Sequence, residues 1–190
     1  VICPDLPGFG DSPIGGDRIS LEEVAVQLEE WMDENHIADP IVIGHSLGGY
    51  VALALLELMG NRIKAIGLFH STAFPDDEEK KGMRDRTIVF LKKNGVEKFV
   101  TSFVPPLFPE KRREELASEI ESAIEEAKRS SLDGLIAYAG AMRDRKDRLE
   151  ILRNFTGPKL LIAGTEDSAV KIEASRAQQD AFSHYVELPG

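Results

Sequence analysis

The sequence predicts an α/β fold, a doubly wound and mostly parallel sheet with an inserted helical cap. Two observations lead to this fold class. Short apolar runs alternate with amphipathic helical segments near both ends of the 190 residues. Between them, helical periodicity continues without a strand-like run. We therefore expect residues 1–73 and 156–190 to form an incomplete α/β core, and residues 74–155 to form the cap.

The first part of the chain alternates between strand and helix. The apolar residues 1–4 predict a strand, and Ser20 begins a capping box that opens a helix. Residues 41–43 and 63–69 predict two further strands, with an apolar helix over residues 50–59 between them. Connections this short indicate a parallel sheet that is covered by helices on both faces.

Helical segments dominate the middle of the chain. Residues 110–129 form a strongly charged amphipathic pattern, and residues 132–142 form another helical segment. Asn94 and Gly95 mark one break, and the proline-rich stretch 105–109 marks a second one. A block of helices inside an α/β pattern is typical of an insertion that covers the edge of the sheet.

The α/β pattern resumes after the helical block. Residues 159–163 predict a strand, residues 172–182 a helix, and residues 185–188 a last strand. In a parallel sheet the functional groups lie at the carboxyl ends of the strands. The side chains that follow each predicted strand are therefore the first candidates for chemistry.

Composition excludes several classes of function. The 33 acidic and 23 basic residues give a net charge of −10, which argues against binding to a nucleic-acid backbone. Cys3 is the only cysteine, so these residues can form neither an internal disulfide nor a multi-cysteine metal site. No apolar run has the length of a membrane span. We expect a cytoplasmic protein without a metal, a cofactor, or a nucleic-acid or membrane partner.

The run G-H-S-L-G over residues 44–48 is the most informative stretch of the chain. It puts Ser46 between a predicted strand and a predicted helix, where an abrupt turn forces the backbone into a strained conformation. We expect glycine at Gly44 and Gly48 because a Cβ there would clash with the neighbouring strand and helix. Ser46 is the candidate nucleophile, and the backbone N–H of Leu47 is the candidate oxyanion donor. The alternative is an ordinary strand-to-helix turn.

A serine hydroxyl needs a base to take its proton and a carboxylate to orient that base. Asp167 follows the predicted strand that ends at Ala163, so it is our candidate for the carboxylate, with Glu166 as the close competitor. Both could instead only cap the following helix. Asp76 and Asp77 follow the preceding strand but lead into the cap, which makes them poorer candidates.

The chain has four histidines that could serve as the base. His36 and His184 precede predicted strands and therefore belong to the opposite edge of the sheet. His45 lies inside the turn, and we expect its ring to point away from the hydroxyl of Ser46. His70 follows a predicted strand on the working edge, where we expect it to line the pocket, with the role of base as a second possibility. The favoured position for the base lies after the last strand, outside these residues.

Taken together, these residues resemble the α/β-hydrolase family. Residues 44–49 are similar to its G-H-S-x-G-G turn, and D-L-P-G-F-G-D-S over residues 5–12 resembles the D-x-x-G-x-G-x-S loop of many esterases and lactonases. G-T-E-D over residues 164–167 resembles the G-x-x-D turn that carries the family's acid. Residues 188–190 resemble the lead-in to its catalytic histidine. The similarity covers the chain from end to end.

Two features of the family have no counterpart in the sequence. The early strand and H-G loop that supply the second oxyanion donor are not found before Val1, and no histidine follows Gly190. Lys171 also replaces a proline that is often found after the acid turn. By this resemblance, a strand between residues 1–4 and residues 41–43 is missing from the sheet. We therefore expect the chain to be a piece of a longer protein, inactive and poorly stable when expressed alone.

The resemblance implies a serine hydrolase that acts on a carboxylic ester, a lactone or a similar small acyl compound. Ser46 would attack the carbonyl, the N–H of Leu47 would stabilise the oxyanion, and Asp167 would orient a histidine outside these residues. No cofactor is needed for this reaction. The candidates for the substrate pocket are His45, His70, Phe74, Phe103 and Phe108. For the cap aromatics, packing in a helical core is the alternative.

Other activities on the same fold remain open. They are carbon–carbon bond hydrolysis, aminopeptidase activity and acyl transfer, because the fold does not decide among them. Serine in the turn excludes the aspartate nucleophile of a haloalkane dehalogenase. The alternative from a different class is a relative that binds a ligand in the same pocket without turning it over.

Overall fold

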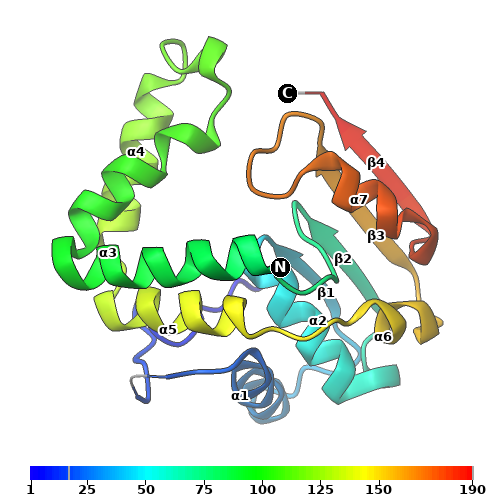
Figure 1. The fold of residues 1–190 in the computed structure, drawn as a ribbon. Coiled ribbons are helices and arrows are strands. Elements are labelled where there is room, and N and C mark those ends of the chain that lie inside the picture. The colour runs from blue at the N-terminus through cyan, green and yellow to red at the C-terminus, as the bar shows by residue number, and fades with distance from the viewer. Residues whose placement is uncertain (17, 190) are drawn as a thin grey trace. The chain divides into compact units, whose positions relative to one another are not determined.

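The computed structural model describes residues 1–16 and 18–189 of the chain (Figure 1). Gly190, the last residue of the expected lead-in to a histidine, lies outside this part. The chain forms two compact units. One consists of Val1–Ser20 with Asp77–Arg143, and the other of Leu21–Asp76 with Asp144–Gly190. The predicted division at residues 74 and 155 stays a prediction.

A parallel sheet forms the centre of the second unit (Figure 1). Its strands lie in the order β1 (Ile41–His45), β2 (Ala65–Phe69), β3 (Lys159–Gly164) and β4 (His184–Leu188). The register pairs His45 with Phe69 and Phe69 with Ile162, so the carboxyl ends of β1, β2 and β3 lie side by side. The α/β fold and four of the predicted strands are confirmed, with ends that differ by a few residues.

The predicted strand over residues 1–4 is wrong. These residues form no regular structure, and Val1 and Ile2 are exposed. A strand needs a neighbour for its backbone N–H and C=O groups. In the described sheet, β1 is an edge strand whose partner is β2, and residues 1–4 belong to the other unit. Apolar composition alone therefore did not suffice to form this strand.

The helices of the second unit follow the predicted order along the chain. They are α1 (Leu21–Glu34), α2 (Leu47–Met59), α6 (Leu149–Asn154) and α7 (Ile172–Gln178), with 3₁₀ turns at η1 (Gly60–Arg62) and η4 (Gln179–Ala181). Helix α2 packs against β1, β2 and α1. It begins at Leu47, directly after Ser46, and therefore three residues earlier than the sequence predicted.

The two faces of the sheet differ in exposure. Side chains on one face are buried, and Ile66, Leu68 and Leu161 on that face are each at most 2% exposed. On the opposite face the apolar side chains of the two edge strands are exposed by 41% to 68%: Ile41, Ile43, Val186 and Leu188. In the described residues, the expected cover of helices on both faces is therefore not found on this face at the edge strands β1 and β4.

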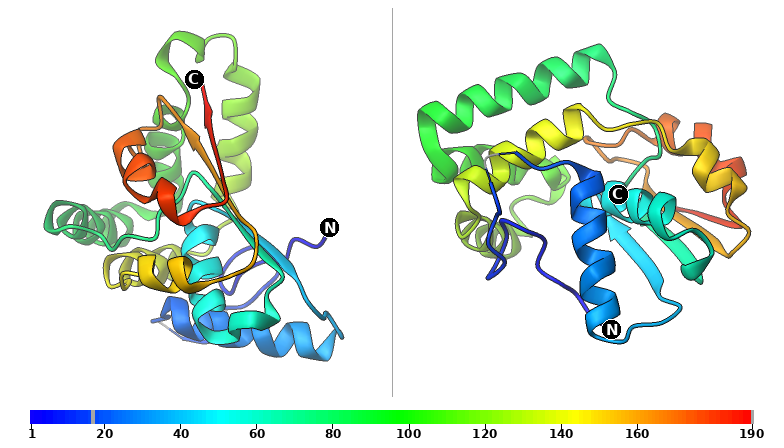
Figure 2. Two further views of the ribbon diagram at one scale, coloured as in Figure 1. Left: turned by 90° about the vertical axis from the view of Figure 1, so that its right-hand side faces the viewer. Right: turned by 90° about the horizontal axis from the view of Figure 1, so that it is seen from below.

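The other unit is helical. It contains α3 (Glu78–Phe103), η2 (Pro105–Leu107), η3 (Glu110–Arg112), α4 (Ala117–Lys128) and α5 (Leu132–Arg143), with α3 and α5 side by side (Figure 2). The expected break at Gly95 is a kink with φ 78° inside α3. The expected helix over residues 110–129 is shorter, because a 3₁₀ turn comes first. None of the helices in the described residues is long and apolar enough to cross a bilayer.

Candidate active site

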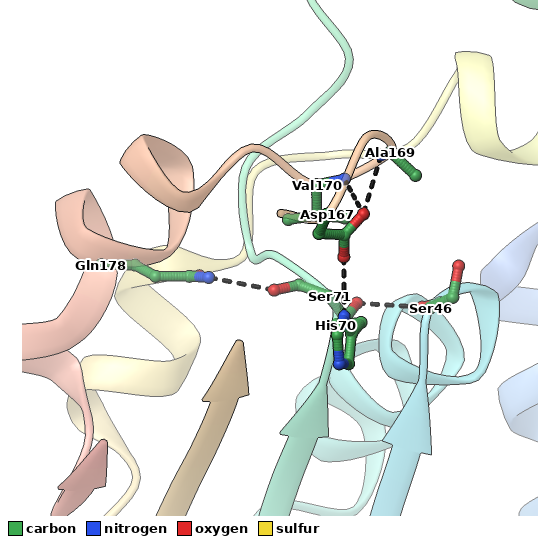
Figure 3. A network of polar contacts seen from close by, with 7 residues as sticks. All are labelled: Ser46, His70, Ser71, Asp167, Ala169, Val170 and Gln178. Atoms are coloured by element: carbon green, nitrogen blue, oxygen red, sulfur yellow. Dashed lines mark hydrogen bonds and ion pairs between the residues drawn. The ribbon is translucent and has the colours of Figure 1, made fainter. Parts of the chain in front are cut away.

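Ser46 lies at the junction between β1 and α2 with a strained backbone. Its φ is 49° and its ψ is −115°, in a region that residues other than glycine rarely occupy. The N–H of Ser46 donates to the carbonyl oxygen of Phe69 at 2.9 Å, which ties the turn to the end of β2. The strain predicted from the sequence is therefore present. Figure 3 shows the Ser46 side chain turned away from the ring of His70.

The glycines around Ser46 serve different purposes. A Cβ on Gly44 would lie 2.2 Å from the carbonyl oxygen of Gly48, so β1 and α2 approach too closely for any side chain there. The same prediction for Gly48 is wrong, because a Cβ on that residue would have no atom within 4 Å. The second close approach is at Gly49, where a Cβ would lie 2.3 Å from the hydroxyl oxygen of Ser71.

Leu47 is the first residue of α2. The N–H groups in the first turn of a helix have no acceptor within the helix, and the helix dipole adds a partial positive charge there. The N–H of Leu47 is thus suited to an oxyanion. The carbonyl of Ser46, in the same peptide unit, accepts hydrogen bonds from the N–H of Gly49 and the hydroxyl of Ser71, each at 2.9 Å.

Asp167 lies in the turn after β3, and both of its carboxylate oxygens are engaged (Figure 3). Oδ1 accepts from the N–H groups of Ala169 at 2.8 Å and Val170 at 3.0 Å. Oδ2 lies 2.7 Å from Nδ1 of His70. The competitor Glu166 is exposed. Asp167 is therefore the carboxylate that the fold orients toward an imidazole.

The two other candidate carboxylates have structural partners. Asp76 forms a buried ion pair with Arg145 at 2.7 Å. Asp77 is the N-cap of α3, where its carboxylate accepts from the N–H of Lys80 at 2.8 Å. Both lead into the helical block, as expected from the sequence. Their roles in the structure are to hold the start of α3 and the chain beside it.

His70 directly follows β2 and has a φ of 49°. Its N–H donates to the carbonyl of Ile162 at 2.9 Å. Gly164 gives its ring room, because a Cβ there would lie 2.7 Å from the Cε1 atom of His70. The contact with Asp167 was not predicted. The signal for it was available, since His70 and Asp167 both follow carboxyl ends of strands that are neighbours in a parallel sheet.

The remaining histidines lie as follows. His45, the last residue of β1, has its ring centroid 5.9 Å from that of His70 and 5.5 Å from that of Phe69. Partial burial disfavours the charged imidazole and lowers the pKa of His45. His36 precedes β1, and His184 begins β4, so both are at the amino ends of strands, as expected.

The three predicted pocket phenylalanines do not share one unit. Phe74 is half-buried in the unit that contains the sheet. Phe103 is 48% exposed in α3, where its ring stacks on Phe99 with a centroid distance of 5.1 Å. Phe108 is half-buried in the same helical unit as Phe103. Their role in binding a substrate stays a prediction.

Two buried polar residues were not predicted from the sequence: Ser71, which contacts Ser46, and Gln178, which contacts Ser71. Ser71 is completely buried and Gln178, the last residue of α7, is 1% exposed. The amide of Gln178 donates to the carbonyl of Ser71 at 3.1 Å and accepts from the N–H of Ala73 at 2.8 Å. No spacing or motif marks Gln178, because it follows a polar stretch of an ordinary short helix. Within the described residues, His, Cys, Asp and Glu form no cluster of three or more that could hold a metal ion.

Similarity to known proteins extends over the whole chain. The model of the alpha/beta hydrolase family matches residues 1–190. Lipase 1 of Psychrobacter immobilis is 26% identical over 183 residues, which cover 91% of this chain and 56% of that protein. The dihydrolipoyllysine-residue acetyltransferase component of the acetoin cleaving system of Pseudomonas putida is 26% identical over 192 residues, covering 100% of this chain and 50% of that protein. The chain thus spans about half the length of these curated relatives.

Solved structures show the same fold. A thermophilic esterase from Thermogutta terrifontis superposes with a TM-score of 0.90 at 25% identity, over 98% of this chain and 70% of the esterase. The enol-lactonase from Burkholderia xenovorans LB400 superposes with a TM-score of 0.86 at 22% identity, over 97% of this chain and 70% of the lactonase.

Proposed function

Because the chain belongs to the α/β-hydrolase family, we propose that it carries the nucleophile and the acid of a serine hydrolase for carboxylic esters, lactones or similar small acyl compounds. The observation that carries the proposal is the backbone of Ser46, which is held at φ 49° between β1 and α2. Such strain persists only where surrounding structure enforces it, and it concentrates at functional sites. Here it presents a hydroxyl at the start of a helix.

The reaction follows from these groups. The hydroxyl oxygen of Ser46 attacks the carbonyl carbon of the substrate while a histidine takes the proton. The N–H of Leu47 donates to the oxyanion of the tetrahedral intermediate. Collapse of this intermediate expels the alcohol, which receives the proton from the histidine, and leaves an acyl group on Ser46. Water then repeats the sequence and releases the acid.

Asp167 orients the histidine in this mechanism. Its Oδ1 is occupied by two backbone N–H groups, which fix the carboxylate and leave Oδ2 for an imidazole. In the described residues Oδ2 lies 2.7 Å from Nδ1 of His70, and its second lone pair can accept from the imidazole of the base. The Ser46 hydroxyl is turned away from the His70 ring, which favours a histidine outside these residues as the base. His70 as the base remains the alternative.

The relatives support acyl chemistry in different forms. One is named a lipase and one solved neighbour an esterase, which favours ester hydrolysis. The Pseudomonas putida relative is named as an acetyltransferase component. Acyl transfer is therefore the second candidate, in which a thiol or alcohol rather than water accepts the acyl group from Ser46. Both candidates share the acyl-enzyme step.

The test is covalent labelling of the protein as its gene encodes it. A fluorophosphonate probe reacts with an activated serine, and we expect one label per chain on Ser46. Labelling should be lost in Ser46→Ala and retained in the matched control Ser118→Ala, which changes an exposed serine of α4. A folded protein that takes no label would contradict the proposal and favour a relative that only binds its ligand.

An added acyl acceptor distinguishes hydrolysis from acyl transfer. Unlabelled protein from a preparation that reacts with the fluorophosphonate is incubated with a p-nitrophenyl ester, with and without an added thiol. A hydrolase releases free acid in both cases, whereas an acyltransferase forms thioester when the thiol is present. The product ratio therefore assigns the second half of the reaction.

A further inference from the structure

The peptide unit between Ser46 and Leu47 carries two functions at once. Its carbonyl accepts hydrogen bonds from Gly49 N–H and from the Ser71 hydroxyl, both at 2.9 Å. Its N–H is the proposed oxyanion donor. A peptide unit is planar, and this one is trans, so its C=O and N–H point in opposite directions. Any group that fixes the carbonyl therefore fixes the direction of the N–H.

Ser71 forms a buried contact with this peptide unit. Its side chain is completely buried, and its hydroxyl reaches the Ser46 carbonyl past Gly49. A side chain at Gly49 would occupy the same space, with its Cβ 2.3 Å from the Ser71 oxygen. The absence of a side chain at position 49 thus allows the hydrogen bond between Ser71 and Ser46.

Gln178 holds the segment that carries Ser71. Its amide forms hydrogen bonds on both sides, to the carbonyl of Ser71 at 3.1 Å and from the N–H of Ala73 at 2.8 Å. Figure 3 shows the resulting line of contacts from Gln178 through Ser71 to Ser46. The amide is 1% exposed, so water cannot replace it without a change in packing. The end of α7 is thereby connected to the proposed nucleophile.

We propose that Ser71 orients the Ser46–Leu47 peptide unit so that the Leu47 N–H points at the oxyanion, and that Gln178 holds Ser71 in place. This inference rests on the proposed function. Both residues are positioning residues, because neither is argued to touch the substrate. The hydrogen bond accepted by the Ser46 carbonyl also polarises the peptide unit and strengthens its N–H as a donor.

The expected effect falls on the transition state. An oxyanion donor acts where charge develops, so its misalignment lowers kcat and leaves KM nearly unchanged. Removal of a donor costs about 10²–10³-fold in kcat. The Ser46 carbonyl keeps its bond from Gly49, so loss of the Ser71 hydroxyl should cost less, about tenfold in kcat.

The experiment compares Ser71→Ala, Gln178→Met and the double variant in the complete gene product. For each, kcat and KM are measured with a p-nitrophenyl ester, and Ki with a boronic acid that forms a tetrahedral adduct on the serine. We expect kcat to fall about tenfold in each single variant, with Ki raised by a similar factor and KM within about twofold. In the double variant the losses should be less than additive, because the two residues act through one contact.

The matched control is Ser175→Ala. Ser175 lies on the same helix as Gln178 and is 1% exposed, and its hydroxyl has no hydrogen-bond partner within the described residues. It should change neither kcat nor Ki. Variants of Ser71 and Gln178 that lower the melting temperature but keep kcat and Ki would overturn the inference and leave the proposed function intact. If Gln178→Met does not fold, Ser71→Ala alone decides. A wild-type protein without esterase activity or labelling would overturn both.

Discussion

The turns that carry Ser46 and Asp167 lie at the same edge of the sheet but are held by different forces. Ser46 is followed by α2, in which nine of 13 residues are buried. Asp167 is followed by α7, a helix of seven residues in which only Ser175 and Gln178 are buried. The first turn is fixed by apolar packing and by the close approach at Gly44, whereas the second is fixed by hydrogen bonds to the carboxylate.

Because the two turns are held by different forces, each should be damaged by a different kind of substitution. A closely packed backbone responds to added volume, because neighbouring atoms cannot move apart without loss of contacts. A carboxylate held by N–H groups and an imidazole responds to the loss of charge or of an acceptor. Changes of volume should therefore damage the Ser46 turn, and changes of polarity should damage the Asp167 turn.

The largest expected effect is that of Asp167→Asn. The amide keeps one oxygen for the N–H groups of Ala169 and Val170 but offers donors where a carboxylate is needed to orient an imidazole. We expect the fluorophosphonate labelling rate of Ser46 to fall by about 10⁴-fold, with the far-ultraviolet circular dichroism unchanged. Glu166→Gln, on the exposed neighbour, is the control and should label normally. Equal losses in both variants would exclude Asp167 as the specific acid.

The second prediction concerns the packing of the Ser46 turn. Gly44→Ala puts a Cβ 2.2 Å from the carbonyl oxygen of Gly48, and we expect it to lower the free energy of unfolding by about 3 kcal/mol. Gly48→Ala is the matched control, because a Cβ there meets nothing within 4 Å, and it should change stability by no more than about 1 kcal/mol. Urea denaturation measures both. Similar values for the two variants would show that the close approach of β1 and α2 does not hold the turn.

The third prediction tests whether His70 is the base. If it only holds Asp167, His70→Gln should lower the labelling rate of Ser46 by about tenfold or less, because one hydrogen bond is weakened. A general base contributes about 10²–10⁴-fold to the rate. A loss of more than about 10²-fold in the labelling rate would therefore identify His70 as the base and remove the need for a histidine elsewhere. The labelling rate of Asp167→Asn, measured in the same experiment, serves as the reference.

The smallest expected effect is a pH dependence of the ion pair between Arg176 of α7 and Glu187 of β4. Two hydrogen bonds hold the pKa of Glu187 at about 2 instead of 4.5. The larger effect comes from Arg176 and the smaller one from Tyr185. A carboxyl whose pKa is lowered on folding stabilises the fold above pH 4.5, and this contribution is lost as the pH falls from 4.5 toward 2. Glu187→Gln should lower the melting temperature slightly at neutral pH, and the difference from wild type should vanish near pH 2. Exposed Glu173 on α7 supplies the control, Glu173→Gln.

Much of the site could be predicted from the sequence because its signals are local. The turn at Ser46 is read from glycine spacing between an apolar strand and an apolar helix, and both elements are present. Asp167 is read from its position after a strand. Each of these inferences needs only a few neighbouring residues, because the turn geometry is imposed by the abrupt change from strand to helix.

The rest depends on contacts between distant parts of the chain. Residues 1–4 have the composition of a strand, but a strand forms only where another strand offers its backbone groups. Gly49, not Gly48, is the second crowded glycine, because the crowding comes from Ser71, which lies 22 positions further along the chain. Gln178 also depends on distant contacts, because its role comes from hydrogen bonds to the backbone of Ser71 and Ala73.

The most direct test of the central claim is to trap the acyl group on Ser46. The complete gene product is mixed with a p-nitrophenyl ester, quenched in acid within the first turnover, and analysed by peptide mass spectrometry. We predict a burst of p-nitrophenol that matches the protein concentration, with the acyl mass on the peptide that contains Ser46. Turnover without a burst in which the peptide stays unmodified at all quench times, or an acyl mass on another residue, would contradict Ser46 as the nucleophile.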